Sequence, residues 1–129
     1  MCAGLAALSV AAESALPPVQ RQGAITYVTG GIGLDEAQAL RAAAPQYNLR
    51  LTFAAVSGAY IANAKVVLRD AQGRTVAEAT SDGPYLYFKV PAGKYSVTAE
   101  VGGEAFTKPA QVRDQAGSEI VFRWKTPAD

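Results

Sequence analysis

The chain of 129 residues contains no histidine, and its only cysteine is Cys2. The absence of histidine removes the Ser-His and Cys-His nucleophiles, imidazole metal ligands and the usual proton shuttle near neutral pH. A single cysteine can form neither an internal disulfide bond nor a thiolate zinc site within one chain. The sequence therefore predicts a non-enzymatic protein with no cofactor and no bound metal.

The net charge is also small, because 12 Lys and Arg stand against 11 Asp and Glu, a balance of +1. Such a chain has no long-range field to gather nucleic acid or an anionic membrane surface, so we expect no nucleic-acid partner. Half of the residues are hydrophobic. A chain of this length and composition fits one globular domain, because it can bury roughly two-thirds of its unfolded surface.

Residues 1–15 have the pattern of a secretory signal. The stretch "CAGLAALSVAAESA" is small and apolar and ends in the small residues of a cleavage site. No Lys or Arg precedes it, so the true start could lie upstream of Met1, and Cys2 could then carry a lipid. An amphipathic surface helix fits less well, because residues 3–12 carry Ser9 as their only polar side chain. A membrane span would need roughly 20 apolar residues. We predict a signal peptide over residues 1–15 and a bacterial protein that is periplasmic or secreted.

Residues 16–47 are predicted to form an extended arm followed by one helix. Within the arm, "AITYVT" has the composition of a short strand. Asp35 is in the position of a helix cap, with Gln38 three residues later as in a capping box, and Pro45 ends the helix. The apolar stripe expected on this helix consists of Leu34, Ala37, Leu40 and Ala44.

The loop "GGIG" between arm and helix raises the question of a phosphate site, because Gly30, Gly31 and Gly33 precede a helix N-terminus. A dinucleotide loop needs a third glycine where this chain has Glu36, and a P-loop needs Gly-Lys-Ser/Thr. Asp35 and Glu36 would also satisfy the helix dipole and repel an anion. We therefore interpret the three glycines as a turn that lets the arm cross the sandwich before the helix.

From the middle of the chain onward, apolar side chains recur at every second position. In "NLRLTFAAV", Leu49, Leu51 and Phe53 share one face and the residues between them are polar, as in a half-buried strand. Pro109 in a later stretch indicates an edge strand or a bulge. Similar stretches separated by turn residues predict further strands over 64–70, 74–80, 85–90, 94–101, 104–112 and 118–125. Residues 48–126 are therefore predicted to form an all-β fold, a seven-stranded antiparallel Greek-key β-sandwich, preceded by one short N-terminal helix.

The stretch "GAYIANAKVVLRDAQGRTVAEATSDGPYLYFKVPAGKYSVTAEVGGEAF" carries an x-D-x-x-G hairpin, a T-x-x-D/S-G turn, an L-x-P-G-x-Y-like corner and a strand that ends in "GG". With these elements, residues 48–125 resemble carboxypeptidase regulatory-like domains, which are related in fold to transthyretin. At the corner "VPAGKY", Pro91 presets a backbone angle, Gly93 allows the reversal and Tyr95 points its hydroxyl toward the turn. The resemblance implies a structural, carbohydrate-contacting or protein-contacting module. The arm and helix lie outside the general pattern and look like the N-terminal extension of a bacterial exported subgroup.

Alternation in "YLYFKV" places two aromatic side chains and one cation on the face opposite the apolar one. The residues of that outer face are Tyr85, Tyr87 and Lys89. Two tyrosines there could stack on a sugar ring or anchor a protein partner. The helix also needs an apolar surface to lie on, and the same face would supply it, with the tyrosines packed beneath the helix. We favour the covered arrangement, because an uncovered aromatic stripe is rare on a monomer.

Acidic and hydroxyl side chains form no catalytic or metal motif. The acidic candidates for a Ca²⁺ site are Asp35, Glu36, Asp70 and Asp82, which lack the D-x-D-x-D-G ligand run. The serines have no histidine partner, and a carboxylate pair for glycoside hydrolysis would have to come from distant positions. We therefore predict a non-enzymatic exported binding or accessory module of the periplasm. The alternatives are a carbohydrate-binding module that uses the Tyr85 and Tyr87 face, and an envelope scaffold or protein-partner domain.

Overall fold

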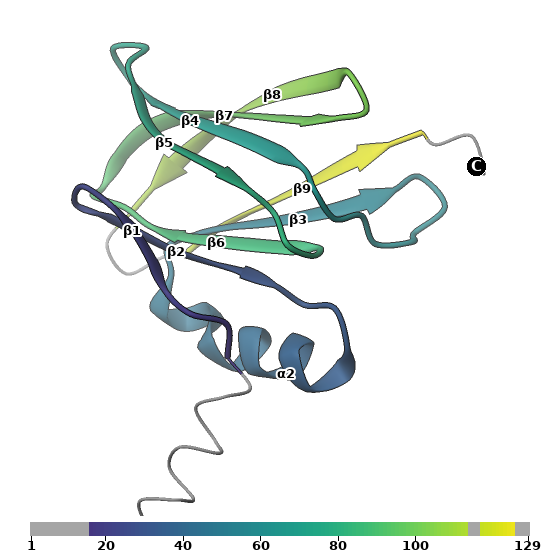
Figure 1. The fold of residues 1–129 in the computed structure, drawn as a ribbon. Coiled ribbons are helices and arrows are strands. Elements are labelled where there is room, and N and C mark those ends of the chain that lie inside the picture. The colour runs from purple at the N-terminus through teal and green to yellow at the C-terminus, as the bar shows by residue number, and fades with distance from the viewer. Residues whose placement is uncertain (1–15, 114–116, 126–129) are drawn as a thin grey trace, which may run out of the picture.

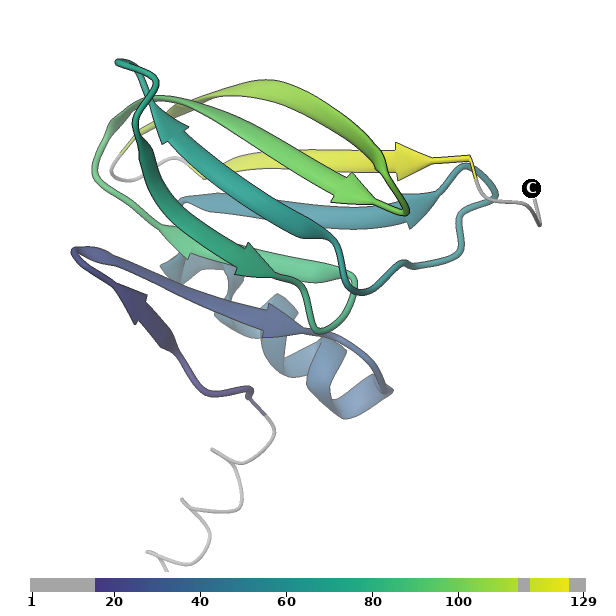
Figure 2. The ribbon, with the colours of Figure 1, turned by 45° about the horizontal axis from the view of Figure 1, so that its top comes forward.

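The computed structural model describes residues 16–113 and 117–125. Two β-sheets stack face to face, and one helix lies on the side of one sheet that faces away from the other (Figures 1 and 2). The predicted signal peptide, residues 1–15, lies outside the described residues. In the part of the chain that the structure describes, no helix is long and apolar enough to cross a membrane. In chain order the elements are β1 (Gln20–Gln22), β2 (Ile25–Gly30), α2 (Leu34–Ala43), the 3₁₀ turn η1 (Ala44–Gln46), β3 (Leu49–Ala55), β4 (Lys65–Asp70), β5 (Thr75–Thr80), β6 (Tyr85–Lys89), β7 (Gly93–Val101), β8 (Glu104–Val112) and β9 (Ser118–Trp124).

The fold is mostly β, as the sequence predicted, but the number and direction of the strands differ from the prediction. The five-stranded sheet has the order β1-β2-β6-β3-β9, and the four-stranded sheet has the order β5-β4-β7-β8. The described residues form nine strands instead of seven, because the arm adds β1 and β2 to the first sheet. Strand β9 runs parallel to β3, whereas the other pairs are antiparallel. Strand β9 comes after β8, which lies in the opposite sheet, so no hairpin joins β9 to β3. An antiparallel direction is therefore not imposed by a tight turn.

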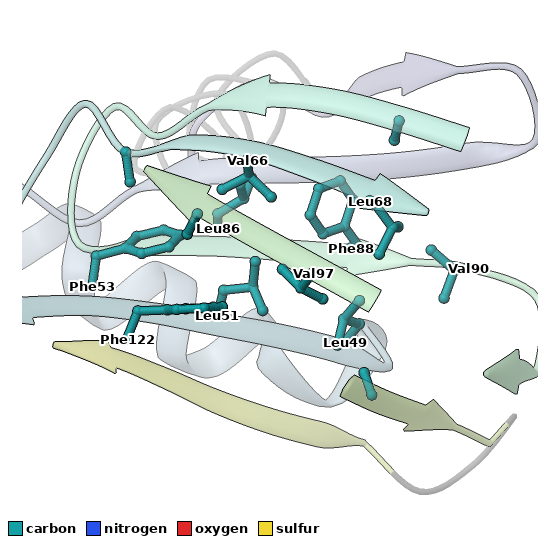
Figure 3. Packing of buried hydrophobic residues seen from close by; sticks show 14 of the residues in the cluster. Leu49, Leu51, Phe53, Val66, Leu68, Leu86, Phe88, Val90, Val97 and Phe122 are labelled. Carbon is teal, nitrogen blue, oxygen red and sulfur yellow. The ribbon is translucent and has the colours of Figure 1, made fainter. Parts of the chain in front are cut away.

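The core lies between the two sheets and is built by the alternation that the sequence shows. The side chains of Leu49, Leu51 and Phe53 on β3 are completely buried (Figure 3). Phe122 of β9 stacks against Phe53, with ring centroids 6.0 Å apart. The opposite sheet contributes Val66, Leu68 and Val97, which meet these rings and leucines from across the sandwich (Figure 3). Burial of such side chains stabilises the fold by about 1.5–3 kcal/mol each.

Side chains bridge the two sheets along both open sides of the sandwich. On one side, the Gln22 side-chain amide donates to the Glu78 carbonyl and accepts from the Glu78 main-chain N–H at 3.0 Å. On the other side, Lys108 Nζ donates to the Val121 carbonyl at 2.8 Å, and Trp124 Nε1 donates to a β8 carbonyl at 2.9 Å. These bonds satisfy main-chain groups at strand edges that would otherwise be open for pairing with another chain.

The "VPAGKY" corner between β6 and β7 is fixed by its tyrosine. The Tyr95 hydroxyl donates to the Pro91 carbonyl at 2.7 Å, and the ring packs against the main core. The bend falls on Ala92, whereas Gly93 begins β7 opposite Val112 with φ of 157°. A Cβ on Gly93 would meet only the Tyr95 ring, at 3.8 Å, an ordinary contact. Space beside the Cα is therefore available, and it is the positive φ that favours glycine at this position.

Candidate binding surface

The glycine loop leads directly into α2 without a side-chain cap. Gly33 is the N-cap residue, and its carbonyl accepts from the Ala37 main-chain N–H at 3.0 Å. Asp35 is therefore not the cap that the sequence predicted. It lies in the first turn of the helix, beside Glu36, where a negative charge is favourable because the helix dipole is positive there. The apolar stripe is also shorter than expected, since Leu34 is 68% exposed.

Glu36 folds back over the loop and takes the position that an anion would need. Its Oε1 accepts from the Gly31 main-chain N–H at 2.7 Å and lies against the Cα of Gly30. Gly31 has φ of 106°, and a Cβ there would lie 2.5 Å from Cδ2 of Tyr85. Gly30 and Gly31 are thus enclosed by a carboxylate and an aromatic ring, which is a packing role and leaves no amide cradle for phosphate.

Helix α2 covers the outer face of β2 and β6. The side chains of Tyr85 and Tyr87 are only 7% and 5% exposed, and Leu40 packs on them with no exposed surface. This second core consists of Val28, Leu40, Ala43, Tyr47, Tyr85 and Tyr87. Burial raises the pKa of Tyr87 to about 12. Of the three predicted contact residues, Lys89 alone is exposed, at the end of β6 opposite Thr26. Neither tyrosine ring therefore offers an open face to a sugar.

The register of the five-stranded sheet continues this outer face across β3 and β9. Side chains at paired positions lie in rows that run across the strands, about 5 Å apart from one strand to the next. Three rows are formed in this way: Tyr87–Arg50–Glu119, Tyr85–Thr52–Val121 and Tyr60–Ala54–Arg123. The helix packs on Tyr87 and Tyr85, which begin two of these rows. At the β9 end of the rows, Val121 is 39% exposed and Arg123 is exposed.

Arg50, in the first row, binds the C-terminal end of α2. Arg50 Nη1 donates to the carbonyls of Ala44 and Tyr47, at 3.3 and 3.2 Å. Its Nε lies 3.9 Å from Oε2 of Glu119. The Arg50 guanidinium therefore satisfies carbonyls after the C-terminal turn of α2, where a cation is also favoured by the helix dipole.

The remaining rows border on a cluster that the sequence did not single out, whose longer side chains are exposed while Ala54 is buried and Thr52 is half-buried. Arg41 Nη1 donates to the Tyr85 hydroxyl at 3.3 Å, and this hydroxyl donates to that of Tyr60 at 3.5 Å. The Tyr60 ring lies 5.9 Å from the Tyr85 ring and is 63% exposed. The hydrogen bond with Tyr85 is the main cause of a raised pKa for Tyr60. We call Arg41, Thr52, Ala54, Tyr60, Val121 and Arg123 the open strip.

The open strip is basic. Within residues 16–113 and 117–125, the ion pairs closer than 4.0 Å join Arg50 to Glu119 and Arg74 to Asp70. Neither Arg41 nor Arg123 takes part in one of these pairs, and both are exposed. The strip itself contains no acidic residue. It therefore presents two guanidinium groups and the Tyr60 hydroxyl on one side of the molecule.

A hollow of about 450 Å³ lies elsewhere, between the β1–β2 turn and the "VPAGKY" corner, with Ile25, Val76 and Tyr95 in its wall. Its polar groups are already engaged. The Asp70 carboxylate accepts from the main-chain N–H groups of Gln72 and Arg74 and from the Arg74 guanidinium, each at 3.0 Å. The Tyr95 hydroxyl is bound to the Pro91 carbonyl. The hollow therefore offers an apolar shape with few free donors or acceptors for ligand recognition.

Comparison with known proteins does not assign a family. No family model matches this chain, and no curated protein matches it. Among solved structures, the chain is similar to the Bacillus anthracis TIE protein, with 19% sequence identity and a TM-score of 0.45. The match covers 60% of this chain and 16% of that protein, so it spans only a small part of the length of the TIE protein. A likeness at this level transfers neither fold nor function.

Proposed function

We propose that this chain is a non-enzymatic, exported binding or accessory module that contacts a protein partner through the open strip. The observation that supports this proposal is the uneven use of one sheet face. The chain covers the Tyr85 and Tyr87 half with its own helix, but it leaves Tyr60, Arg41 and Arg123 in solvent. Tyr and Arg are enriched at protein interfaces, because each combines a broad contact area with directional hydrogen bonds.

A protein partner fits the surface better than a neutral carbohydrate. Sugar rings bind by stacking on open aromatic faces, and Tyr85 and Tyr87, the residues considered for that alternative, are buried. Tyr60 offers one exposed ring. Two exposed side chains on the strip or close to it in sequence are aliphatic, Val121 at 39% and Val56 at 59% exposure. Aliphatic side chains contribute to protein contacts through apolar burial.

We also propose that residues 48–126 are a Greek-key domain of the carboxypeptidase regulatory-like type. Two local features support this relationship. The Tyr95 hydroxyl is bound to the Pro91 carbonyl at the corner. Asp70 organises the β4–β5 hairpin by accepting from the main-chain N–H groups of Gln72 and Arg74. Both features belong to the turn chemistry on which the sequence resemblance rests.

Export is proposed from the pattern of residues 1–15. Mass spectrometry of the protein recovered from bacterial cell fractions should find a mature chain that begins near Ala15 in the periplasmic fraction. An intact chain that retains Met1 in the cytoplasm would contradict the proposal.

The binding function can be tested in cells by site-specific photo-crosslinking. A photoreactive phenylalanine replaces Val121 on the open strip, and in a matched variant it replaces Thr107, an exposed residue of β8 in the other sheet. We expect a discrete crosslinked protein from position 121 and none from position 107. Crosslinks from position 107 alone would place the contact elsewhere and contradict the proposal.

A further inference from the structure

We infer that the open strip binds an extended acidic segment of a partner protein, with carboxylates at Arg41 and Arg123 and an apolar side chain against Val121. This inference rests on the proposed function and adds the chemistry of the partner. It follows from the charges, the register and the exposed apolar surface of the strip.

Charge complementarity is the first argument. Arg41 and Arg123 are exposed and belong to neither of the described ion pairs. Within residues 16–113 and 117–125, Arg41 donates one hydrogen bond, to the Tyr85 hydroxyl, although its guanidinium carries five N–H donors. The hydroxyl of the exposed Tyr60 lies 3.5 Å from the Tyr85 hydroxyl, so a ligand that contacts Arg41 also meets this phenol. A ligand on this surface must therefore supply acceptors, and carboxylates form the strongest hydrogen bonds with guanidinium groups.

The register of the strip fits an extended peptide. Tyr60 and Arg123 flank Ala54 on its two sides, so their main chains lie roughly 10 Å apart across two strand spacings. The small side chains of Ala54 and Thr52 form the floor between these longer neighbours. In an extended peptide, side chains two residues apart lie about 7 Å from each other on one face. Carboxylates at that spacing can meet donors on both sides of Ala54, with Arg123 on one side and Tyr60 on the other.

The remaining surface distinguishes a peptide from other anions. Val121 pairs with Thr52 and precedes Arg123 by two residues on β9, and its 39% exposed side chain can bury an apolar residue of a peptide. A nucleic acid gains its affinity from many phosphate contacts, and the two arginines of the strip provide few. An acidic saccharide would use the charges but would leave the aliphatic surface without a partner.

The inference can be tested by nuclear magnetic resonance titration of the ¹⁵N-labelled chain. The probe is the peptide acetyl-Glu-Leu-Glu-Leu-Glu-Leu-amide, and the comparison ligands are its Lys-for-Glu version and trigalacturonate. We expect saturable shifts of the main-chain amides of Thr52, Ala54, Tyr60, Val121 and Arg123 with the acidic peptide alone. Shifts confined to other residues, or saturable binding of trigalacturonate in place of the peptide, would overturn the inference.

Two double variants that remove the same number of charges distinguish binding at the strip from a general effect of net charge. Arg41→Gln with Arg123→Gln removes two cations from the strip, whereas Lys65→Gln with Arg69→Gln removes two cations from β4 of the other sheet. The first pair should weaken peptide binding by about tenfold or more, because each charge-assisted hydrogen bond contributes more than 1 kcal/mol. The second pair should leave affinity within about twofold, since its distant charges are screened. An equal loss in both pairs would overturn the inference, provided that the amide spectra show both variants folded.

Failure of this inference is distinguishable from failure of the proposed function. If the peptide does not bind but position 121 still crosslinks a protein in cells, the acidic chemistry is wrong and the binding function stands. If position 121 crosslinks nothing while position 107 does, the binding surface itself is wrong.

Discussion

The outer face of the five-stranded sheet differs between its β2–β6 half and its β3–β9 half. On the first half, Tyr85 and Tyr87 are almost fully buried beneath α2. On the second half, the paired positions hold Val121 and Arg123, which remain exposed. Both halves are built from strands with the same period-two pattern. The difference shows that the outward-facing residues, and not the strand period, decide whether a helix or solvent lies on a sheet.

The largest expected effect on stability comes from the packing of α2 on the β2–β6 half. Leu40 has no exposed surface and packs with Tyr85 and Tyr87 in the second core. Leu40→Ala should lower the free energy of unfolding by about 4 kcal/mol, since the change removes buried methyl groups and leaves a cavity. Chemical denaturation measures this loss.

Leu34→Ala is the matched control on the same helix. Leu34 is 68% exposed, so its truncation should change the free energy of unfolding by less than about 0.5 kcal/mol. Equal losses in the two variants would mean that α2 does not lie on the sheet as described.

The glycine loop provides the second comparison, because Gly31 and Gly33 both have positive φ but different surroundings. Gly31→Ala should cost about 3 kcal/mol, since it combines a strained φ of 106° with a Cβ 2.5 Å from the Tyr85 ring. Gly33 has φ of 90° and no atom within 4 Å of its would-be Cβ, so Gly33→Ala should cost only about 1 kcal/mol. Thermal and chemical unfolding of both variants measure the difference. Equal losses of unfolding free energy would show that Gly31 is not packed against Tyr85.

The two acidic residues at the start of α2 have smaller and unequal effects. Glu36→Ala removes the acceptor of the Gly31 main-chain N–H and should cost about 1 kcal/mol. Asp35→Ala removes only a favourable charge in the first turn and should cost about 0.3 kcal/mol. A larger loss for Asp35→Ala, again by chemical denaturation, would restore Asp35 as the cap.

The smallest effect at neutral pH is expected at Tyr87. Tyr87→Phe should change stability by less than about 0.5 kcal/mol near pH 7, because the ring stays in place. Burial raises the folded-state pKa from 10.0 to about 12. The contribution of the neutral phenol is therefore fully present below pH 10 and is lost as pH rises toward 12, where the unfolded phenol ionises first. Denaturation curves between pH 9 and 12 should fall less steeply for Tyr87→Phe, and parallel curves would contradict the burial of this hydroxyl.

The sequence predicts the elements of this fold better than their arrangement. Alternation at Leu49, Leu51 and Phe53 is a local property, and the structure places all three in the core. The parallel direction of β9 could not be predicted, because Phe122 would alternate in the same way in either direction. The sequence favoured a helix that covers Tyr85 and Tyr87, and the structure packs Leu40 with both rings.

The candidate surface is harder to predict from the sequence than the fold. Tyr60 lies in the loop "SGAYIANA", where no period marks its side chain as buried or exposed. Gly33 caps the helix through its main chain alone, so no side chain indicates the cap position, and Asp35 is the stronger sequence signal. The pairing of Ala54 with both Arg123 and Tyr60 joins residues from distant parts of the chain. The sole signal for the strip was a single aromatic residue among turn residues.

Hydroxyl-radical footprinting with peptide mass spectrometry tests the half-covered sheet face most directly. The oxidation rate of a side chain follows its exposure, and the exposed Tyr60 lies directly beside the covered Tyr85. Tyr60, at 63% exposure, should be oxidised several times faster than Tyr85 and Tyr87, at 7% and 5%. Oxidation of Tyr85 and Tyr87 as fast as that of Tyr60 would show that α2 leaves this half of the sheet open, and would contradict the account.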